Sequence, residues 1–128
     1  PIEKEWEKAA RGVDGRDYPW GEAMGYQNDY ANTRDFLIGR TSSVTEFEQG
    51  MSPFGCFDMA GNVWEWCVQL HSKGHVTQRV VRGGSWLNYM VHSKCTYRNT
   101  FDPDERYPAA GFRCVSRQHT EVDDDDDD

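Results

Sequence analysis

Apolar positions at the start of the chain follow a helical period over residues 2–11. The apolar members share one face, and charged residues fill the other positions; these apolar members are Ile2, Trp6, Ala9 and Ala10. The spacing predicts an amphipathic helix with one buried side. Gly12 follows the last apolar position, and because glycine is a common helix stop we expect the helix to end there.

Three later segments have the pattern of β-strands: residues 62–68, 79–86 and 110–115. The first alternates between two faces, with Val63, Glu65 and Cys67 on one and Trp64, Trp66 and Val68 on the other. Gly83 and Gly84 interrupt the second segment, and such a pair permits a bulge or a close approach of the backbone. The third segment predicts a last core strand.

The rest of the chain is rich in turn-forming residues. Residues 22–53 are polar and have no clear period, although Ile38 and residues 44–47 are candidates for short strands. A long segment, residues 87–109, separates the last two predicted strands. One helix, a few short strands and long ordered loops predict an α+β fold.

The composition limits how this fold is held together. The chain has 128 residues, of which 37% are hydrophobic and 13% aromatic, so a modest core must rest on a few large rings. The candidates are Trp6, Trp20, Trp64, Trp66 and Trp86. We assign residues 1–117 to a single domain and residues 118–128 to an acidic tail.

The formal net charge is −8, and Asp123 to Asp128 form one acidic block. Like charges repel one another, so we expect the tail to be disordered. The charge argues against nucleic acid as a partner. No stretch approaches the roughly 20 apolar residues that span a membrane, which argues against membrane insertion. No secretory signal is visible, and the sequence leaves the localisation open.

The four cysteines are Cys56, Cys67, Cys95 and Cys114. They allow three disulfide pairings in an oxidising compartment, and their spacing does not match a zinc site. The simpler interpretation treats them as small buried hydrophobic residues.

Short sequence blocks follow one another along nearly the whole chain. They are Pro1–Arg11 (PIEKEWEKAAR), Tyr18–Gly21, Tyr30–Asn32, Asp58–Cys67 (DMAGNVWEWC), Arg82–Trp86 (RGGSW), Tyr97–Asn99 and Gly111–Cys114 (GFRC). In this order they resemble the formylglycine-generating enzyme (sulfatase-modifying factor) family, a branch of the C-type-lectin-like folds. The family domain has a further N-terminal portion, so the resemblance implies that this chain is a fragment or a shortened member.

The resemblance also indicates what is missing. The family's oxidase binds copper(I) through two cysteines that follow its Gly-Gly-Ser block, and thiolates are the soft ligands that copper(I) needs. Here Asn88 stands at the first position, and the second falls in a shorter stretch without a cysteine. Cys95 and Cys114 match framework positions instead. We therefore expect no copper and no formylglycine formation. Another branch uses iron and histidines, but those ligands come largely from a separate domain.

A calcium site of the family matches Asp58, Gly61, Val63 and Glu65, which would supply two carboxylates and two backbone carbonyls. The alternative is that the two carboxylates cap turns or pair with an arginine such as Arg82 or Arg113. A second family calcium site would use Asn32 with a nearby acid such as Asp35.

Other polar residues have simpler interpretations. His71 and His75 stand four apart, as a helical metal pair would, but their setting predicts an exposed hairpin loop. His92 has no obvious catalytic partner. Four arginines could form an anion site, although internal pairing with carboxylates such as Asp58, Glu65, Asp102 and Asp104 is the favoured interpretation; these arginines are Arg82, Arg98, Arg106 and Arg113.

In the lectin-like fold the segment 87–109 forms the ligand-facing surface. Between its framework blocks stand residues of mixed chemistry: Leu87, Asn88, Tyr89, Val91, His92, Thr100, Phe101, Asp102, Tyr107, Pro108 and Ala109. Large apolar groups on an exposed face usually signal binding. All these residue types have codons that end in a pyrimidine. The pattern resembles variable proteins diversified by retroelements, which randomise adenines in asparagine-type codons.

The main hypothesis is therefore a non-catalytic protein that binds a protein or cell-surface ligand. A rigid framework, including Trp64, Trp66, Trp86, Arg98 and Phe112, would support the variable loops. Alanines at Tyr89, Phe101 and Tyr107 should then abolish binding with little change in Tm. The second hypothesis is an enzyme or accessory subunit of the sulfatase-modifying type. A third is a regulatory domain cut from a larger protein.

Overall fold

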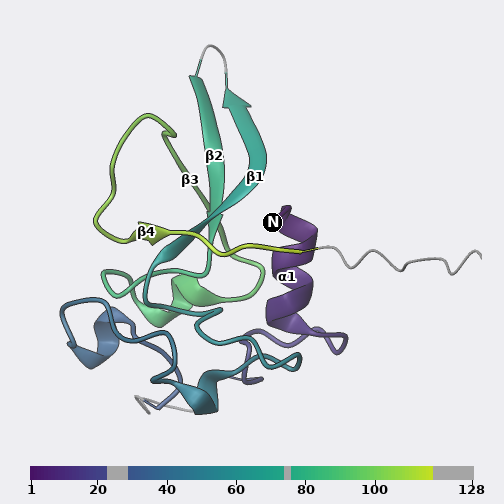
Figure 1. Ribbon diagram of the computed structural model, residues 1–128, viewed down its shortest axis with the longest axis vertical. Coiled ribbons are helices and arrows are strands. Elements are labelled where there is room, and N and C mark those ends of the chain that lie inside the picture. The colour runs from purple at the N-terminus through teal and green to yellow at the C-terminus, as the bar shows by residue number, and fades with distance from the viewer. Residues whose placement is uncertain (23–28, 74–75, 117–128) are drawn as a thin grey trace, which may run out of the picture.

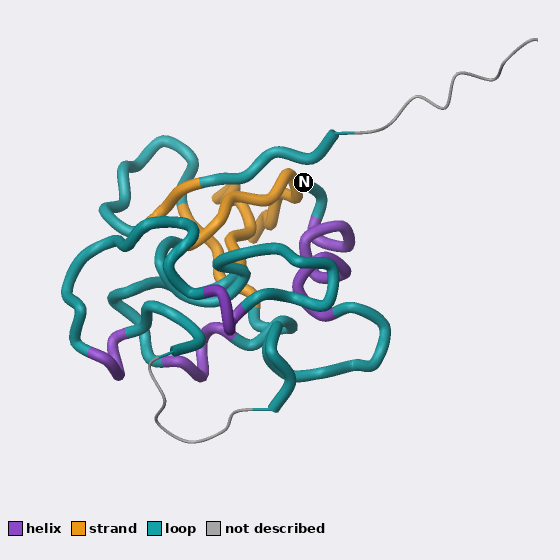
Figure 2. Tube along the Cα trace, turned by 60° about the horizontal axis from the view of Figure 1, so that its bottom comes forward, coloured by secondary structure: helices purple, strands orange, loops and turns teal. Residues whose placement is uncertain are grey.

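A computed structural model of the chain describes residues 1–22, 29–73 and 76–116. One α-helix, α1 (Glu3–Arg11), precedes the strands β1 (Trp64–Lys73), β2 (Val76–Arg82), β3 (Arg98–Phe101) and β4 (Ala110–Gly111). The 3-10 helices η1 (Arg34–Phe36), η2 (Glu48–Gly50) and η3 (Met90–Ser93) lie within the long loops. Loops make up most of the trace, and the strands gather in one layer beside α1 (Figure 2). The α+β, loop-rich fold is confirmed.

The strands form one mixed sheet in the order β3-β2-β1-β4. β1 pairs antiparallel with β2, β2 pairs antiparallel with β3, and β4 runs parallel to β1. The two edge strands, β3 and β4, are consecutive in the chain. The loop 102–109 therefore connects opposite edges of the sheet (Figure 1).

The two faces of β1 have different neighbours, as its alternating sequence predicts. Cys67 packs in the core with Trp6 and Ala10 of α1, and Glu65 accepts a hydrogen bond from the Trp6 indole at 3.0 Å. On the other face, Trp64 and Trp66 contact aromatic rings of the segment 101–107. In Figure 1 the helix and this loop accordingly lie on opposite sides of the sheet.

The core beneath α1 is small. It consists of Trp6, Ala10, Met59, Cys67, Val80 and Cys95, with Ala9 and Cys56 packed against it. The predicted helix is thus confirmed, and its apolar face is the one that is buried. Gly12 ends it with a φ of 70°.

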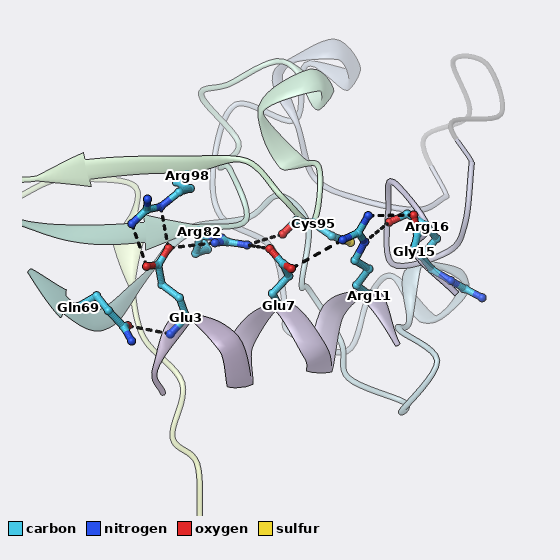
Figure 3. A network of polar contacts seen from close by, with 9 residues as sticks. All are labelled: Glu3, Glu7, Arg11, Gly15, Arg16, Gln69, Arg82, Cys95 and Arg98. Atoms are coloured by element: carbon cyan, nitrogen blue, oxygen red, sulfur yellow. Dashed lines mark hydrogen bonds and ion pairs between the residues drawn. The ribbon is translucent and has the colours of Figure 1, made fainter. Parts of the chain in front are cut away.

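A polar network ties α1 to the sheet (Figure 3). The guanidinium of Arg82, only 3% exposed, bonds Glu3 at 3.0 Å, Glu7 at 2.6 Å and the Cys95 carbonyl at 2.6 Å. Arg98 bonds Glu3 at 2.8 Å. The favoured internal pairing of the arginines is confirmed for these two. Their partners are helix residues, however, and not the carboxylates that the sequence suggested.

Several predicted strands differ in the structure. Ile38 and residues 44–47 lie in loops and turns, because Val44 is exposed and Phe47 alone of these packs inward. The segment 79–86 leaves the sheet at Arg82, since Gly83 and Gly84 have φ values of 99° and 71°.

The last predicted strand is also shorter than expected. Only Ala110 and Gly111 pair with β1, and Phe112 is 78% exposed, so it is not the framework residue that the sequence suggested. Trp20 is only half-buried and stacks between Tyr18 and Tyr30.

Some predictions fall outside the described residues. The acidic tail 118–128 and His75 lie there, while the His71 backbone belongs to β1 and pairs with Gln78, so the predicted loop is shorter. Among the described residues, no helix has the length and apolarity to cross a membrane.

Candidate functional site

A pocket of about 200 Å³ opens where segments far apart in the sequence meet. Its lining, which we call the recognition pocket, consists of Trp64, Ser85, Leu87, Asn88, Asn99, Phe101, Tyr107, Pro108 and Ala109. Six of these residues belong to the predicted ligand-facing set, and they come from all three of its stretches. The fold thus brings separated sequence positions onto one concave surface.

The side chain of Asn88 is fixed by hydrogen bonds from residues of the framework blocks. Its Oδ1 accepts hydrogen bonds from the Trp64 indole N–H at 2.8 Å and from the Ser85 hydroxyl at 2.5 Å. Its backbone carbonyl accepts a hydrogen bond from the Arg34 amide at 2.9 Å. Asn88 therefore forms part of the pocket's rigid floor and has a defined orientation.

One wall of the recognition pocket is aromatic. The rings of Phe101 and Tyr107 stack with centroids 4.0 Å apart and planes at 15°. Trp64 and Trp66 each form a T-shaped contact with Phe101, with ring centroids 6.0 and 5.8 Å apart. The Tyr107 hydroxyl accepts a hydrogen bond from the Asp102 amide at 3.0 Å. Such edge and offset contacts fix ring positions while the half-buried rings keep one side open.

The remaining predicted residues divide into exposed and engaged positions. Leu87, Tyr89, Val91 and Pro108 are exposed. Thr100 donates from its hydroxyl to Gln78, Asp102 accepts from the Asp104 amide, and His92 packs edge-on against Tyr97.

Ala109 differs from the expectation of an exposed face. It is only 5% exposed, and its carbonyl accepts a hydrogen bond from the Trp64 amide at 2.7 Å. Its backbone pairing draws it under the pocket, so it can contribute only to the floor.

Sequence reasoning missed several residues near this surface. Arg34 and Leu37 come from the segment without a clear period, yet Arg34 lies over the Tyr89 ring at 5.2 Å. Ser85 and Asn99 belong to recognisable blocks but line the pocket. No periodic signal marks residues that a loop brings in from a distance.

A second pocket, of about 340 Å³, contains all four predicted calcium ligands: Asp58, Gly61, Val63 and Glu65. Asp58 has a left-handed backbone, with φ 54°, which Asp tolerates better than most residues. Its Oδ1 is buried without a hydrogen-bond partner among the described residues. Burial raises the pKa of Asp58 to about 7, against the opposing effect of Arg113.

The other carboxylate of this pocket is already engaged. Both oxygens of Glu65 accept hydrogen bonds from Arg113, one of them at 2.8 Å, and the Trp6 indole donates to Oε1 at 3.0 Å. The predicted alternative, pairing of Glu65 with Arg113, is therefore present. Within the described ranges, no group of three or more His, Cys, Asp or Glu residues could hold a metal. A cation here would depend on Asp58 and backbone carbonyls, with Glu65 shared.

Asn32 and Asp35, the suggested second calcium pair, make separate contacts. Asn32 donates to the Arg40 carbonyl at 2.8 Å and to the Ser42 hydroxyl at 3.0 Å. Asp35 accepts from the Thr33 hydroxyl at 2.9 Å and from the Met90 amide at 2.8 Å. Both side chains thus have structural hydrogen bonds of their own.

The cysteines are all free thiols. Cys67 and Cys95 are buried, as the simpler interpretation predicts, whereas Cys114 is exposed and Cys56 intermediate. Burial raises the pKa of Cys67 to about 11 and that of Cys95 to about 12, which disfavours the thiolate that a copper site requires. The lining of the recognition pocket contains no cysteine.

Comparisons with known proteins place this geometry in a family. The model of the Sulfatase-modifying factor enzyme 1-like domain matches residues 1–118. The Inactive C-alpha-formylglycine-generating enzyme 2 of Bos taurus is 33% identical over 91% of this chain and 43% of its own length. The Formylglycine-generating enzyme of Streptomyces coelicolor is 31% identical over 91% of this chain and 46% of its own length.

Solved structures agree with the sequence comparison. Treponema denticola variable protein 1 superposes with a TM-score of 0.78 at 27% identity, covering 88% of this chain and 45% of that one. PvdO from Pseudomonas aeruginosa gives 0.72 at 26% identity, covering 87% and 49%. The chain spans less than half the length of the curated relatives named above. The chain belongs to the formylglycine-generating enzyme, or sulfatase-modifying factor, family.

Proposed function

We propose that this chain is a non-catalytic binding domain whose ligand contacts residues 87–92, 100–102 and 107–109. The observation that carries the proposal is the recognition pocket, in which these segments meet around half-exposed aromatic rings. Aromatic side chains give a large contact area and lose little conformational freedom on binding. A partner protein or a cell-surface ligand fits such a surface.

The absence of catalytic thiols from the recognition pocket supports a binding role. Asn88 occupies the position at which the resemblance places the first copper-binding cysteine, and its Oδ1 already accepts two hydrogen bonds. One relative of this chain is itself named an inactive enzyme. A surface that keeps the family's framework without its copper-binding cysteines is suited to recognition.

We further propose that the surface is diversified by a retroelement. Exposed positions such as Leu87, Tyr89 and Val91 have room for other side chains. The likeness to Treponema denticola variable protein 1 supports this proposal. The buried Ala109 and the hydrogen-bonded Asn88 should then accept fewer residue types.

Sequencing of the DNA around the gene tests the diversification. We expect a near-copy of codons 82–113 that differs at adenines and lies beside a reverse transcriptase gene. Absence of both would overturn the diversification and leave an ordinary family member.

A display library tests the binding surface itself. Codons for Leu87, Tyr89, Val91 and Pro108 would be randomised to end in a pyrimidine, with a matched library at Asn88 and Ala109 as control. We expect the first library to fold and to yield specific binders against immobilised lysozyme. The second should lose most folded members. Equal loss of folding in both libraries would show that the exposed positions belong to the framework and would contradict the proposal.

Calcium is a separate proposal for the pocket around Asp58. The unpartnered, buried Oδ1 of Asp58 fits a hard cation, and Gly61 and Val63 would add backbone carbonyls. Glu65 would be shared with Arg113. There calcium would neutralise the buried carboxylate and link the loop before β1 to the sheet.

The alternative function is that of an oxidase or accessory subunit. Its support is the formylglycine-generating enzyme of Streptomyces coelicolor among the relatives. The test is oxygen uptake with copper(I) and a cysteine-containing peptide. Uptake that stops on substitution of Cys114, the exposed thiol, would favour the enzyme and contradict the binding role.

A further inference from the structure

A hollow distinct from the recognition pocket and from the pocket around Asp58 also has Leu87 in its lining. It has a volume of about 350 Å³ and is lined by Arg34, Leu37, Gly39, Trp86 and Leu87. We call it the Arg34 groove. Leu87 therefore belongs to the lining of both this groove and the recognition pocket.

The groove has a cation at its edge. Arg34 is exposed, and its guanidinium lies 5.2 Å from the centroid of the Tyr89 ring. Over the described parts of the chain, no carboxylate lies within ion-pair distance of it, unlike Arg82, Arg98 and Arg113. The contact with the Tyr89 ring orients the planar guanidinium of Arg34 and leaves the N–H groups at its edge available to an anion.

The side of the groove that carries Arg34 is fixed to the recognition loop. The Arg34 amide donates to the Asn88 carbonyl at 2.9 Å, and the Met90 amide donates to Asp35 at 2.8 Å. The Thr33 hydroxyl holds the same carboxylate oxygen at 2.9 Å. This preorganisation reduces the entropy that a ligand must overcome.

The lining of the Arg34 groove also includes two exposed apolar side chains. Leu37 is 84% exposed and has a left-handed backbone with φ 56°, a conformation that is costly for a leucine. Leu87 is also exposed, and Trp86 belongs to the same lining. Such strain on an exposed apolar residue is often found at ligand-contacting loops.

We propose that the Arg34 groove binds an acidic side chain that stands next to a large apolar side chain in a peptide segment of a partner protein. The carboxylate pairs with Arg34, and the apolar group covers Leu37, Trp86 and Leu87. This inference rests on the proposed binding function and gives its partner a chemistry. Charge complementarity favours an acidic ligand, because the lining of the groove contains the Arg34 cation and no carboxylate.

The test uses two blocked dipeptides that differ only in charge, Ac-Phe-Glu-NH2 and Ac-Phe-Gln-NH2, titrated into the full chain in the millimolar range. The readout is the indole N–H signal of Trp86 in ¹⁵N–¹H NMR spectra, assigned by Trp86→Phe. The Trp86 Nε1 is buried without a partner among the described residues, so its signal reports on the groove. We expect the acidic peptide to bind about two- to fivefold more tightly, as for an exposed ion pair.

Two variants test whether the preference for the acidic peptide depends on Arg34. Arg34→Gln should make the two peptides bind equally, while unchanged Trp6 and Trp64 indole signals show that the fold is intact. Arg40→Gln removes a neighbouring exposed charge outside the groove and should change nothing. Equal binding of the peptides to the unaltered chain would overturn the proposal. So would a shift confined to Trp64, because the peptide would then lie in the recognition pocket.

Failure of this inference is distinguishable from failure of the proposed function. Specific binders from the display library, together with no Arg34-dependent peptide binding, would leave the recognition pocket supported and the groove overturned. Peptide binding in the groove with no folded, binding library members would support the groove and contradict the variable surface.

Discussion

The two sides of the sheet are built by different kinds of contact. On the α1 side, Trp6 is buried and Arg82 joins two carboxylates and a carbonyl in a network that leaves little room for change. On the other side, the rings of Phe101 and Tyr107 stack on each other and remain half-exposed. The helix side therefore fixes the scaffold, and the loop side offers a surface on which side chains can vary.

The largest loss of stability is expected from a substitution on the α1 side of the sheet. Arg82→Ala leaves the Cys95 carbonyl without its donor. It also leaves Glu7 only its longer ion pair with Arg11, at 3.8 Å. Loss of a partner from a buried ion pair costs about 3–5 kcal/mol. Arg98→Ala is the matched control, since that side chain is 53% exposed and an exposed pair contributes about 1 kcal/mol or less. Urea unfolding measures both. Equal, small losses would mean that the network does not fix the scaffold.

The next effect concerns pH. The folded-state pKa of Asp58 is raised from 3.8 to about 7, so the folded state binds this proton more tightly than the unfolded state. Its contribution to stability is therefore full below pH about 4, is lost as pH rises to about 7, and then stays constant. The size is on the order of 2–4 kcal/mol.

Asp58→Asn should remove this part of the pH profile, as measured by unfolding at several pH values. Added calcium should raise the Tm of the unaltered chain at neutral pH and leave that of Asp58→Asn unchanged. If the two proteins respond alike to both treatments, neither the buried carboxylate nor the cation site is as described.

A smaller effect tests the aromatic wall. Phe101→Ala and Tyr107→Ala should each destabilise the fold by about 1–2 kcal/mol, because each ring supports Trp66 and the other ring. A double-mutant cycle should give a coupling of about 0.5–1.5 kcal/mol. The sequence-based expectation of an unchanged Tm for these alanines is therefore revised. A coupling near zero would show that the stack is not formed in solution.

The smallest effect is expected at exposed loop positions. Tyr89→Ala and Val91→Ala should change the unfolding free energy by no more than about 0.5 kcal/mol, because Tyr89 is 50% exposed and Val91 52% exposed. Thermal denaturation checks this. A large loss at either position would remove the distinction between a rigid side and a variable one.

The sequence predicts the elements whose pattern is local. The period of Ile2, Trp6 and Ala10 identifies α1, and the alternation of Glu65 and Cys67 against Trp64 and Trp66 identifies both faces of β1. The glycine pair at Gly83 permits a bulge or a close approach, and a Cβ added at Gly83 would lie 3.1 Å from the Trp6 ring. Local spacing is sufficient where neighbours in sequence share one surface.

Contacts between distant loops could not be predicted in this way. No local sequence pattern indicates that Arg34 contacts Tyr89, or that Arg82 pairs with Glu3 and Glu7. Phe112 lies in the segment 110–115, which the sequence predicts as a last core strand, yet only Ala110 and Gly111 pair with β1. The candidate calcium ligands do line one pocket, but they were expected from the family resemblance and not from a local pattern.

The loop 102–109 runs from one edge of the sheet to the other, and this sets which changes of length it can accept. Crossing three inter-strand spacings of about 4.8 Å requires roughly 14 Å of chain, which a few fully extended residues can supply. The remaining length of the loop serves to place Tyr107 against Phe101. Insertions that lengthen this loop would add little closure entropy, about 0.6 kcal/mol for each doubling of the loop length. Deletions soon draw Tyr107 away from Phe101 and then pull β4 from β1. Among natural homologues, this loop should therefore grow far more often than it shrinks.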